Sequence, residues 1–99
     1  MDLRFEWHET KASANRRKHR VAFEEAKTVF GDPRSLVIAD AVHSEAEDRW
    51  VRIGISAMGR LLVVVYAERG DVIRLMSGRR ANKREETDYE QTNQRPEGG

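Results

Sequence analysis

The chain has 99 residues, which allows one small domain with a single modest core. Its hydrophobic content of 38% and charged content of 35% fit a globular protein better than a disordered or membrane chain, and the lack of cysteine excludes disulfides, thiolate zinc sites and a cysteine nucleophile. The net charge of +1 hides a segregated pattern, because positive charge gathers in residues 1–21 and 49–84 and negative charge in 22–48 and 85–99.

The N-terminal part of the chain predicts a short strand followed by two helices. Residues 3–7 alternate apolar and polar side chains, which is typical of a strand. Residues 9–19 then form a helix with Lys11, Asn15, Lys18 and His19 on one face, which is either functional or simply solvated. A second short amphipathic helix covers residues 21–30 and stops at Gly31 and the following Asp-Pro turn.

Strands dominate from residue 36 onward. Residues 36–38 predict a short strand, and residues 40–48 predict an acidic loop that carries His43. Residues 51–55 alternate, residues 61–66 are apolar throughout, and residues 72–76 form a further strand, with a turn at Met58-Gly59. We expect residues 61–66 to be the central strand, covered on one face by the two helices.

A basic segment follows the last predicted strand. We expect residues 79–89 to form a helix that begins with Arg79, Arg80, Lys83 and Arg84 and becomes acidic toward its end. This charge gradient opposes the helix dipole, and cations at a helix N-terminus would attract phosphate. The segment therefore predicts a site for a polyanion or an acidic partner, with a solvated charged helix as the alternative.

The order and spacing of many short motifs resemble one known family, the BrnT-type toxins of bacterial type II toxin–antitoxin systems. The matching residues are Phe5-Glu6-Trp7, Lys11, Asn15, Lys18-His19, Val21, Phe23-Glu24-Glu25-Ala26, Phe30-Gly31-Asp32-Pro33, Arg49-Trp50, Ile53-Gly54, Gly59-Arg60-Leu61, Val64-Val65, Ile73-Arg74, Ser77-Gly78-Arg79-Arg80-Ala81, Glu85 and Tyr89. The resemblance implies a RelE-like α+β fold, ribonuclease activity that inhibits translation, and neutralisation by a small antitoxin with a DNA-binding ribbon-helix-helix domain. It also implies a heterotetramer of two toxins and two antitoxins.

Two positions depart from the family pattern. His8 replaces the usual Asp after the Trp, so the first helix loses a good N-cap acceptor. Arg20 replaces the usual Gly after Lys-His, at a helix end whose left-handed backbone suits Gly far better. We therefore expect a strained or altered turn beside His19.

Metal-independent RNA cleavage needs a base for the 2′-hydroxyl, cations for the phosphorane charge and an acid for the 5′-oxygen. The predicted catalytic residues are His19, Arg49, Arg79 and Arg80, with His43 as a second candidate for proton transfer. The predicted RNA-binding residues are Lys11, Lys18, Lys83 and Arg84. We expect no metal and no cofactor.

Each candidate also has a purely structural interpretation. His19 can serve only to cap the first helix, Arg49 can pair with Glu47 or Asp48, and His43 can be an ordinary loop residue. Trp7 and Trp50 can stack on bases, but they lie in strand patterns that favour the core. Tyr89 is expected to pack the last helix onto the sheet.

The sequence as a whole predicts a single α+β domain over residues 1–91, with a mainly antiparallel twisted sheet, two N-terminal helices, one basic C-terminal helix and a disordered tail over 92–99. The start of the chain lacks the features of a secretory signal and the longest apolar run is too short to span a bilayer, so we expect a cytoplasmic endoribonuclease toxin without membrane contact. The alternatives are a non-catalytic module that binds RNA or a partner, and an inactive copy that only binds an antitoxin. Convergence of His19 and the cations on one cleft would favour the nuclease.

Overall fold

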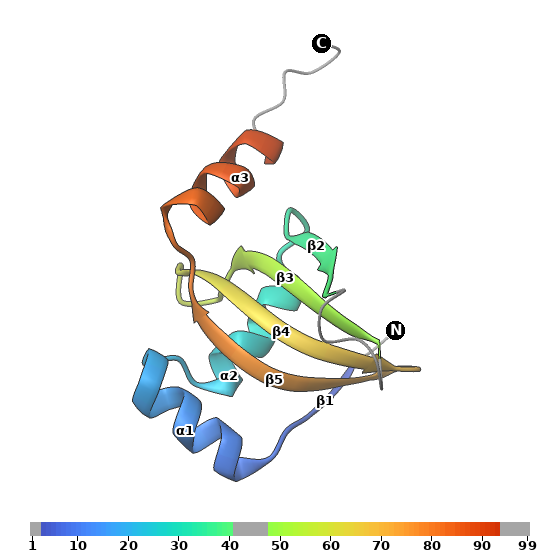
Figure 1. Cartoon of the computed structure of the whole chain (residues 1–99). Coiled ribbons are helices and arrows are strands. Elements are labelled where there is room, and N and C mark those ends of the chain that lie inside the picture. The colour runs from blue at the N-terminus through green and yellow to red at the C-terminus, as the bar shows by residue number, and fades with distance from the viewer. Residues whose placement is uncertain (1–2, 41–47, 94–99) are drawn as a thin grey trace.

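The computed structural model describes residues 3–40 and 48–93, which form one five-stranded sheet with the N-terminal helices packed against it and the last helix extending from it (Figure 1). The elements in chain order are β1 (Arg4–Glu6), α1 (Glu9–His19), α2 (Phe23–Ala26), the 3-10 helix η1 (Lys27–Gly31), β2 (Leu36–Ala39), β3 (Arg49–Ile55), β4 (Leu61–Arg69), β5 (Val72–Arg80) and α3 (Lys83–Asn93). This arrangement confirms the predicted α+β class. His43 and residues 94–99 lie outside the described residues, and α3 extends two residues into the predicted tail.

The strands are ordered β1-β5-β4-β3-β2, and every pairing is antiparallel except that of β1 with β5. β4 lies at the centre, as its uninterrupted apolar sequence predicts, because only a strand covered on both faces buries side chains on each. Leu62, Val64 and Tyr66 belong to the main core, whereas Val63 packs on the other face with Ile53.

The main core lies between the sheet and the layer formed by α1, α2 and η1. Val21, Phe23, Ala26 and Val29 are fully buried there. The single second helix predicted over residues 21–30 is divided into the short α-helix α2 and the 3-10 helix η1. Trp7 and Trp50 pack against this core, as their strand positions predict. Edge-to-face ring contacts such as Trp7 with Phe23, whose centroids are 5.9 Å apart, add specific geometry to this packing.

Both ends of α1 show the consequences of the two unusual residues. His8 is the N-cap and its side chain makes no capping hydrogen bond. Arg20 ends the helix with φ 60° and ψ 33°, a left-handed conformation that costs a residue with a Cβ roughly 1–2 kcal/mol. The strained turn predicted beside His19 is therefore present.

The start of the last helix differs from the prediction. Arg79 and Arg80 are the last residues of β5, and α3 begins only at Lys83. The reason is an N-cap that the prediction overlooked, in which Asn82 Oδ1 accepts from the N–H of Glu85 at 2.9 Å and the Glu85 carboxylate accepts from the N–H of Asn82 at 2.8 Å. Glu85 and Glu86 then occupy the first turn, where negative charge favours the dipole.

The prediction of a basic C-terminal helix was therefore wrong in its charge, because four acidic residues outnumber Lys83 and Arg84 within α3. Figure 1 shows α3 extending away from the main body of the sheet. Tyr89 anchors it, since the ring packs with Ile53 and Val63 and the hydroxyl donates to Asp32 Oδ2 at 2.7 Å. None of the described helices is long and apolar enough to cross a membrane.

Candidate RNA-binding groove

Four of the predicted site residues line two adjoining hollows between α1 and the face of the sheet opposite the main core. The first hollow, of about 250 Å³, is lined by Lys11, Ala14, Asn15, Lys18, His19 and Met76. The second, of about 430 Å³, is lined by Lys11, Asp40, Arg49, Val65, Met76 and Ser77. Because Lys11 and Met76 line both, we treat the two hollows together as one surface, the sheet groove.

A β-bulge shapes the middle of the sheet groove. Val65 pairs with Ser77 and Tyr66 pairs with Leu75, so Met76 is an extra residue in β5. A bulge of this kind lets two successive residues oppose one residue of the neighbouring strand. Met76 and Ser77 therefore both line the second hollow, although simple alternation would send them to opposite faces.

The charges of the sheet groove are mainly positive. Lys11 and Lys18 come from α1 and Arg49 from the start of β3, and Asp40, just after β2, is the acidic residue of the second hollow. Val65 and Met76 supply an apolar floor between them. Cations in such a groove can hold the phosphate groups of a nucleic acid.

Asn15 has a structural role rather than an exposed binding role. It is 7% exposed, and its amide donates to the carbonyl oxygens of Val21 and Gly78, both at 2.9 Å. Its Oδ1 accepts from the N–H of Gly78 at 3.1 Å. Asn15 thus satisfies both backbone groups of Gly78 and fixes α1 to β5, which sets the position of the neighbouring groove residues Lys11 and Lys18.

Arg79 lies outside the residues that line the sheet groove. It follows Ser77 by two positions on β5 and shares that face of the sheet, but its guanidinium makes a bidentate pair with Glu85 at 2.9 and 2.7 Å. This hydrogen-bonded pair raises the pKa of Arg79 and lowers that of Glu85. Its donors are therefore directed to the start of α3.

The remaining predicted cations are not brought to the groove. Arg80 follows Arg79 in the strand and so faces the helical side of the sheet, where its charge helps to lower the pKa of Glu25. Lys83 and Arg84 are exposed in the first turn of α3. The structure therefore separates the four cations that the sequence places together.

Sequence reasoning did not identify Asp40, Met76 and Ser77 as groove residues. It placed Asp40 at the start of an acidic loop, Met76 at the end of a predicted strand, and Ser77 between that strand and the predicted basic helix. The bulge that exposes the latter two depends on pairing between strands, which leaves no mark in a single sequence. The position of Asp40 directly after a strand was the one signal available.

Glu25, on α2, is the one buried charged residue in the part of the chain that the structure describes. Glu25 is 6% exposed and receives hydrogen bonds from the guanidinium of Arg60, including one from Nε at 2.9 Å, and from Ser56 Oγ at 2.7 Å. The hydrogen bonds from Arg60 outweigh the effect of burial and lower the pKa of the Glu25 carboxyl. Arg60 Nη2 also donates to the carbonyl oxygen of Arg20 at 3.1 Å, which supports the strained turn.

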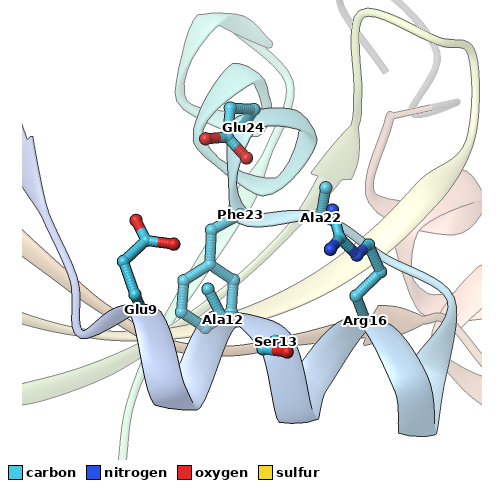
Figure 2. Close-up of a pocket in the computed structure, with 7 residues that line it drawn as sticks. All are labelled: Glu9, Ala12, Ser13, Arg16, Ala22, Phe23 and Glu24. Atoms are coloured by element: carbon cyan, nitrogen blue, oxygen red, sulfur yellow. The ribbon is translucent and has the colours of Figure 1, made fainter.

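A small hollow of about 110 Å³ lies between α1 and α2 (Figure 2). The Phe23 ring points from α2 toward Ala12 on α1, and Arg16 points from α1 toward Ala22. Two acidic residues, Glu9 and Glu24, flank the same hollow. Arg16 therefore lies on a different face of α1 from Lys11 and Lys18.

Comparison with known proteins agrees with this architecture. The family model described as the ribonuclease toxin BrnT of type II toxin–antitoxin systems matches residues 7–85. The 1.1 Å crystal structure of the Brucella abortus ribonuclease toxin BrnT is similar in fold, with a TM-score of 0.63 and 20% identity over 83% of this chain and 100% of that one. No curated protein sequence matches the chain. The chain belongs to the family of BrnT ribonuclease toxins of type II toxin–antitoxin systems.

Proposed function

We propose that this chain is a metal-independent endoribonuclease that cleaves RNA in the sheet groove and so inhibits translation. The observation that carries the proposal is that Arg49, which is far from α1 in the sequence, lines a hollow with Lys11, next to the hollow that Lys11 lines with Lys18 and His19. The fold and the family supply the reaction class. The groove supplies the residue types that this reaction needs.

In the proposed reaction, a base removes the proton of a 2′-hydroxyl and the 2′-oxygen attacks the adjacent phosphorus. The bond from phosphorus to the 5′-oxygen breaks, and an acid protonates that oxygen. His19 is the first candidate for proton transfer. The carboxylate of Asp40, which lines the second hollow, is the second candidate. Arg49 stabilises the charge on the pentacoordinate phosphorus, while Lys11 and Lys18 hold neighbouring phosphates.

Membership in a type II toxin–antitoxin family implies an antitoxin partner. We propose that this partner is a ribbon-helix-helix protein that binds DNA, that two copies of each chain assemble, and that the complex is cytoplasmic. A non-catalytic RNA-binding module is the rival function, because the same cations would hold RNA without cutting it. This rival is favoured by the positions of Arg79 and Arg80, which lie outside the groove and so add no cations to it.

The test is cleavage of RNA by purified protein in EDTA, together with growth arrest on induced expression. The wild type should do both, and His19→Ala should cleave about 100-fold to 10,000-fold more slowly while circular dichroism shows a native fold. Lys11→Ala with Lys18→Ala should weaken RNA binding and reduce its salt dependence. Lys27→Ala, which removes an exposed lysine of η1 from outside the groove, is the matched control.

A folded wild type that binds RNA in the groove but neither cleaves it nor arrests growth would replace the nuclease by the binding module. Full activity of His19→Ala would make His19 a structural residue and transfer the base role to Asp40. Cleavage that stops in EDTA would contradict metal independence.

A further inference from the structure

A second surface, which shares no lining residue with the sheet groove, lies between the end of α1, α2 and the turn from β3 to β4. This pocket of about 440 Å³ is lined among others by Arg16, Arg20, Thr28, Ala57, Met58 and Arg60. We call it the arginine pocket. Met58, at 71% exposure, is the most exposed large hydrophobic residue of the described chain.

The polar groups at the floor of the arginine pocket already have partners. Glu25 is neutralised by Arg60 and bonded to Ser56, and Thr28 Oγ1 donates to the Glu25 carbonyl and accepts from the N–H of Ala57 at 2.8 Å. The floor therefore offers mainly apolar surface to a ligand. The charges that remain at the rim are Arg16 and Arg20, opposed only by Glu24, so the rim is positive.

Arg20 gives an independent reason to assign a function to this surface. Its backbone is left-handed, with φ 60°, where glycine would be free of strain. Strained backbone of this kind is held by the surrounding structure and clusters at active sites and ligand-binding positions. Arg20 lines the arginine pocket, and its backbone carbonyl oxygen accepts a hydrogen bond from Arg60.

We propose that the arginine pocket binds an acidic segment of the antitoxin, which inserts one apolar side chain against Met58 and Ala57 and places carboxylates on Arg16 and Arg20. This inference rests on the proposed function for the identity of its partner. A protein fits better than RNA, because the mainly apolar floor and the exposed Met58 suit an apolar side chain. The antitoxin would thus hold the toxin from the side of α1 opposite the RNA.

The experiment titrates the purified full-length antitoxin against wild-type toxin and three folded variants by isothermal calorimetry. Arg20→Gly should weaken binding at least about tenfold while raising the midpoint of thermal unfolding by about 4 °C, because it removes both the guanidinium and the backbone strain. Met58→Glu should weaken binding at least about tenfold without changing RNA cleavage. Arg17→Ala, an exposed cation of α1 outside the pocket, should bind like the wild type.

Opposite changes in stability and affinity for Arg20→Gly would separate a binding role from a structural one. Wild-type affinity in both Arg20→Gly and Met58→Glu would overturn the pocket while leaving the nuclease untouched. Loss of RNA cleavage with unchanged antitoxin affinity in Met58→Glu would reassign the surface to RNA. A wild type that binds no antitoxin would instead refute the proposed partner, and with it this inference.

Discussion

The side chain of Asn15 does for β5 what a neighbouring strand would do. It accepts from the N–H of Gly78 and donates to its carbonyl oxygen, beyond the short stretch where β1 pairs with β5. The sequence places Asn15 on the same helical face as Lys11 and Lys18, and the structure shows why that face is mixed. One member fixes the helix, and the others are free to meet a ligand.

Replacement of Asn15 by Ala should lower the free energy of unfolding by about 3 kcal/mol, because it leaves buried backbone groups of Val21 and Gly78 without partners. Urea denaturation measures the change. Ser13→Ala, at an exposed position of the same helix, should change stability by less than about 0.5 kcal/mol. Equal stabilities of the two variants would contradict this role.

The lowered pKa of Glu25 predicts that the stability of the folded protein depends on pH. Its folded pKa is lowered below the ordinary value of 4.5, first by the hydrogen bonds from Arg60, so its contribution is complete above 4.5 and is lost as pH falls through the folded pKa. At pH 7, Glu25→Gln should cost about 3 kcal/mol, since Arg60 loses its partner but remains partly solvated at 26% exposure.

The difference in unfolding free energy between wild type and Glu25→Gln should therefore shrink as pH falls from 5 toward 3. Asp32 and Glu85 also have lowered pKa values, but both proteins contain them, so their effects cancel in the difference. Denaturation curves at several pH values measure this. A difference that stays constant with pH would show that the ionisation of Glu25 contributes nothing.

At the scale of elements, α1 is a helix without a side-chain N-cap. His8→Asp would supply an acceptor for the first turn and should raise the free energy of unfolding by about 1 kcal/mol. Thermal unfolding measures the gain, and His8→Ala is the control that should show none. An increase with Ala as large as with Asp would point to removal of the imidazole rather than to capping.

The helices and strands themselves follow closely from residue patterns. The predicted helix over residues 9–19 has the bounds of α1, and the apolar run at residues 61–66 is part of the central strand β4. The predicted last helix begins four residues before α3, because the prediction used the four cations as its start. Asn82 and Glu85 have the spacing of a capping box and indicate the observed start.

The site could be predicted only in part, for a physical reason. Lys11, Lys18, His19 and Arg49 line the sheet groove, whereas Arg79 and Arg80 do not. Alternation along a strand sends Arg79 and Arg80 to opposite faces, which a helical interpretation of the same residues cannot reveal. The pair of Glu25 and Arg60 joins a residue of α2 to one in the turn before β4, and no local pattern indicates it.

In the molecule as a whole, α1 separates two surfaces of positive charge. Lys11 and Lys18 line the sheet groove, while Arg16 and Arg20 line the arginine pocket. If both proposals hold, this division places RNA and an acidic partner on different faces of one short helix. It also explains how charge that averages to +1 over the chain can still produce local attraction for anions.

The most direct test of the account compares two arginines on opposite faces of the same sheet. Single-turnover cleavage of a short RNA should be about 100-fold slower for Arg49→Ala, which removes a cation from the sheet groove, and should keep the wild-type rate for Arg80→Ala. Circular dichroism would confirm that both variants fold. Arg80→Ala losing as much activity as Arg49→Ala, or Arg49→Ala retaining the full rate, would contradict the assignment of the groove as the site of cleavage.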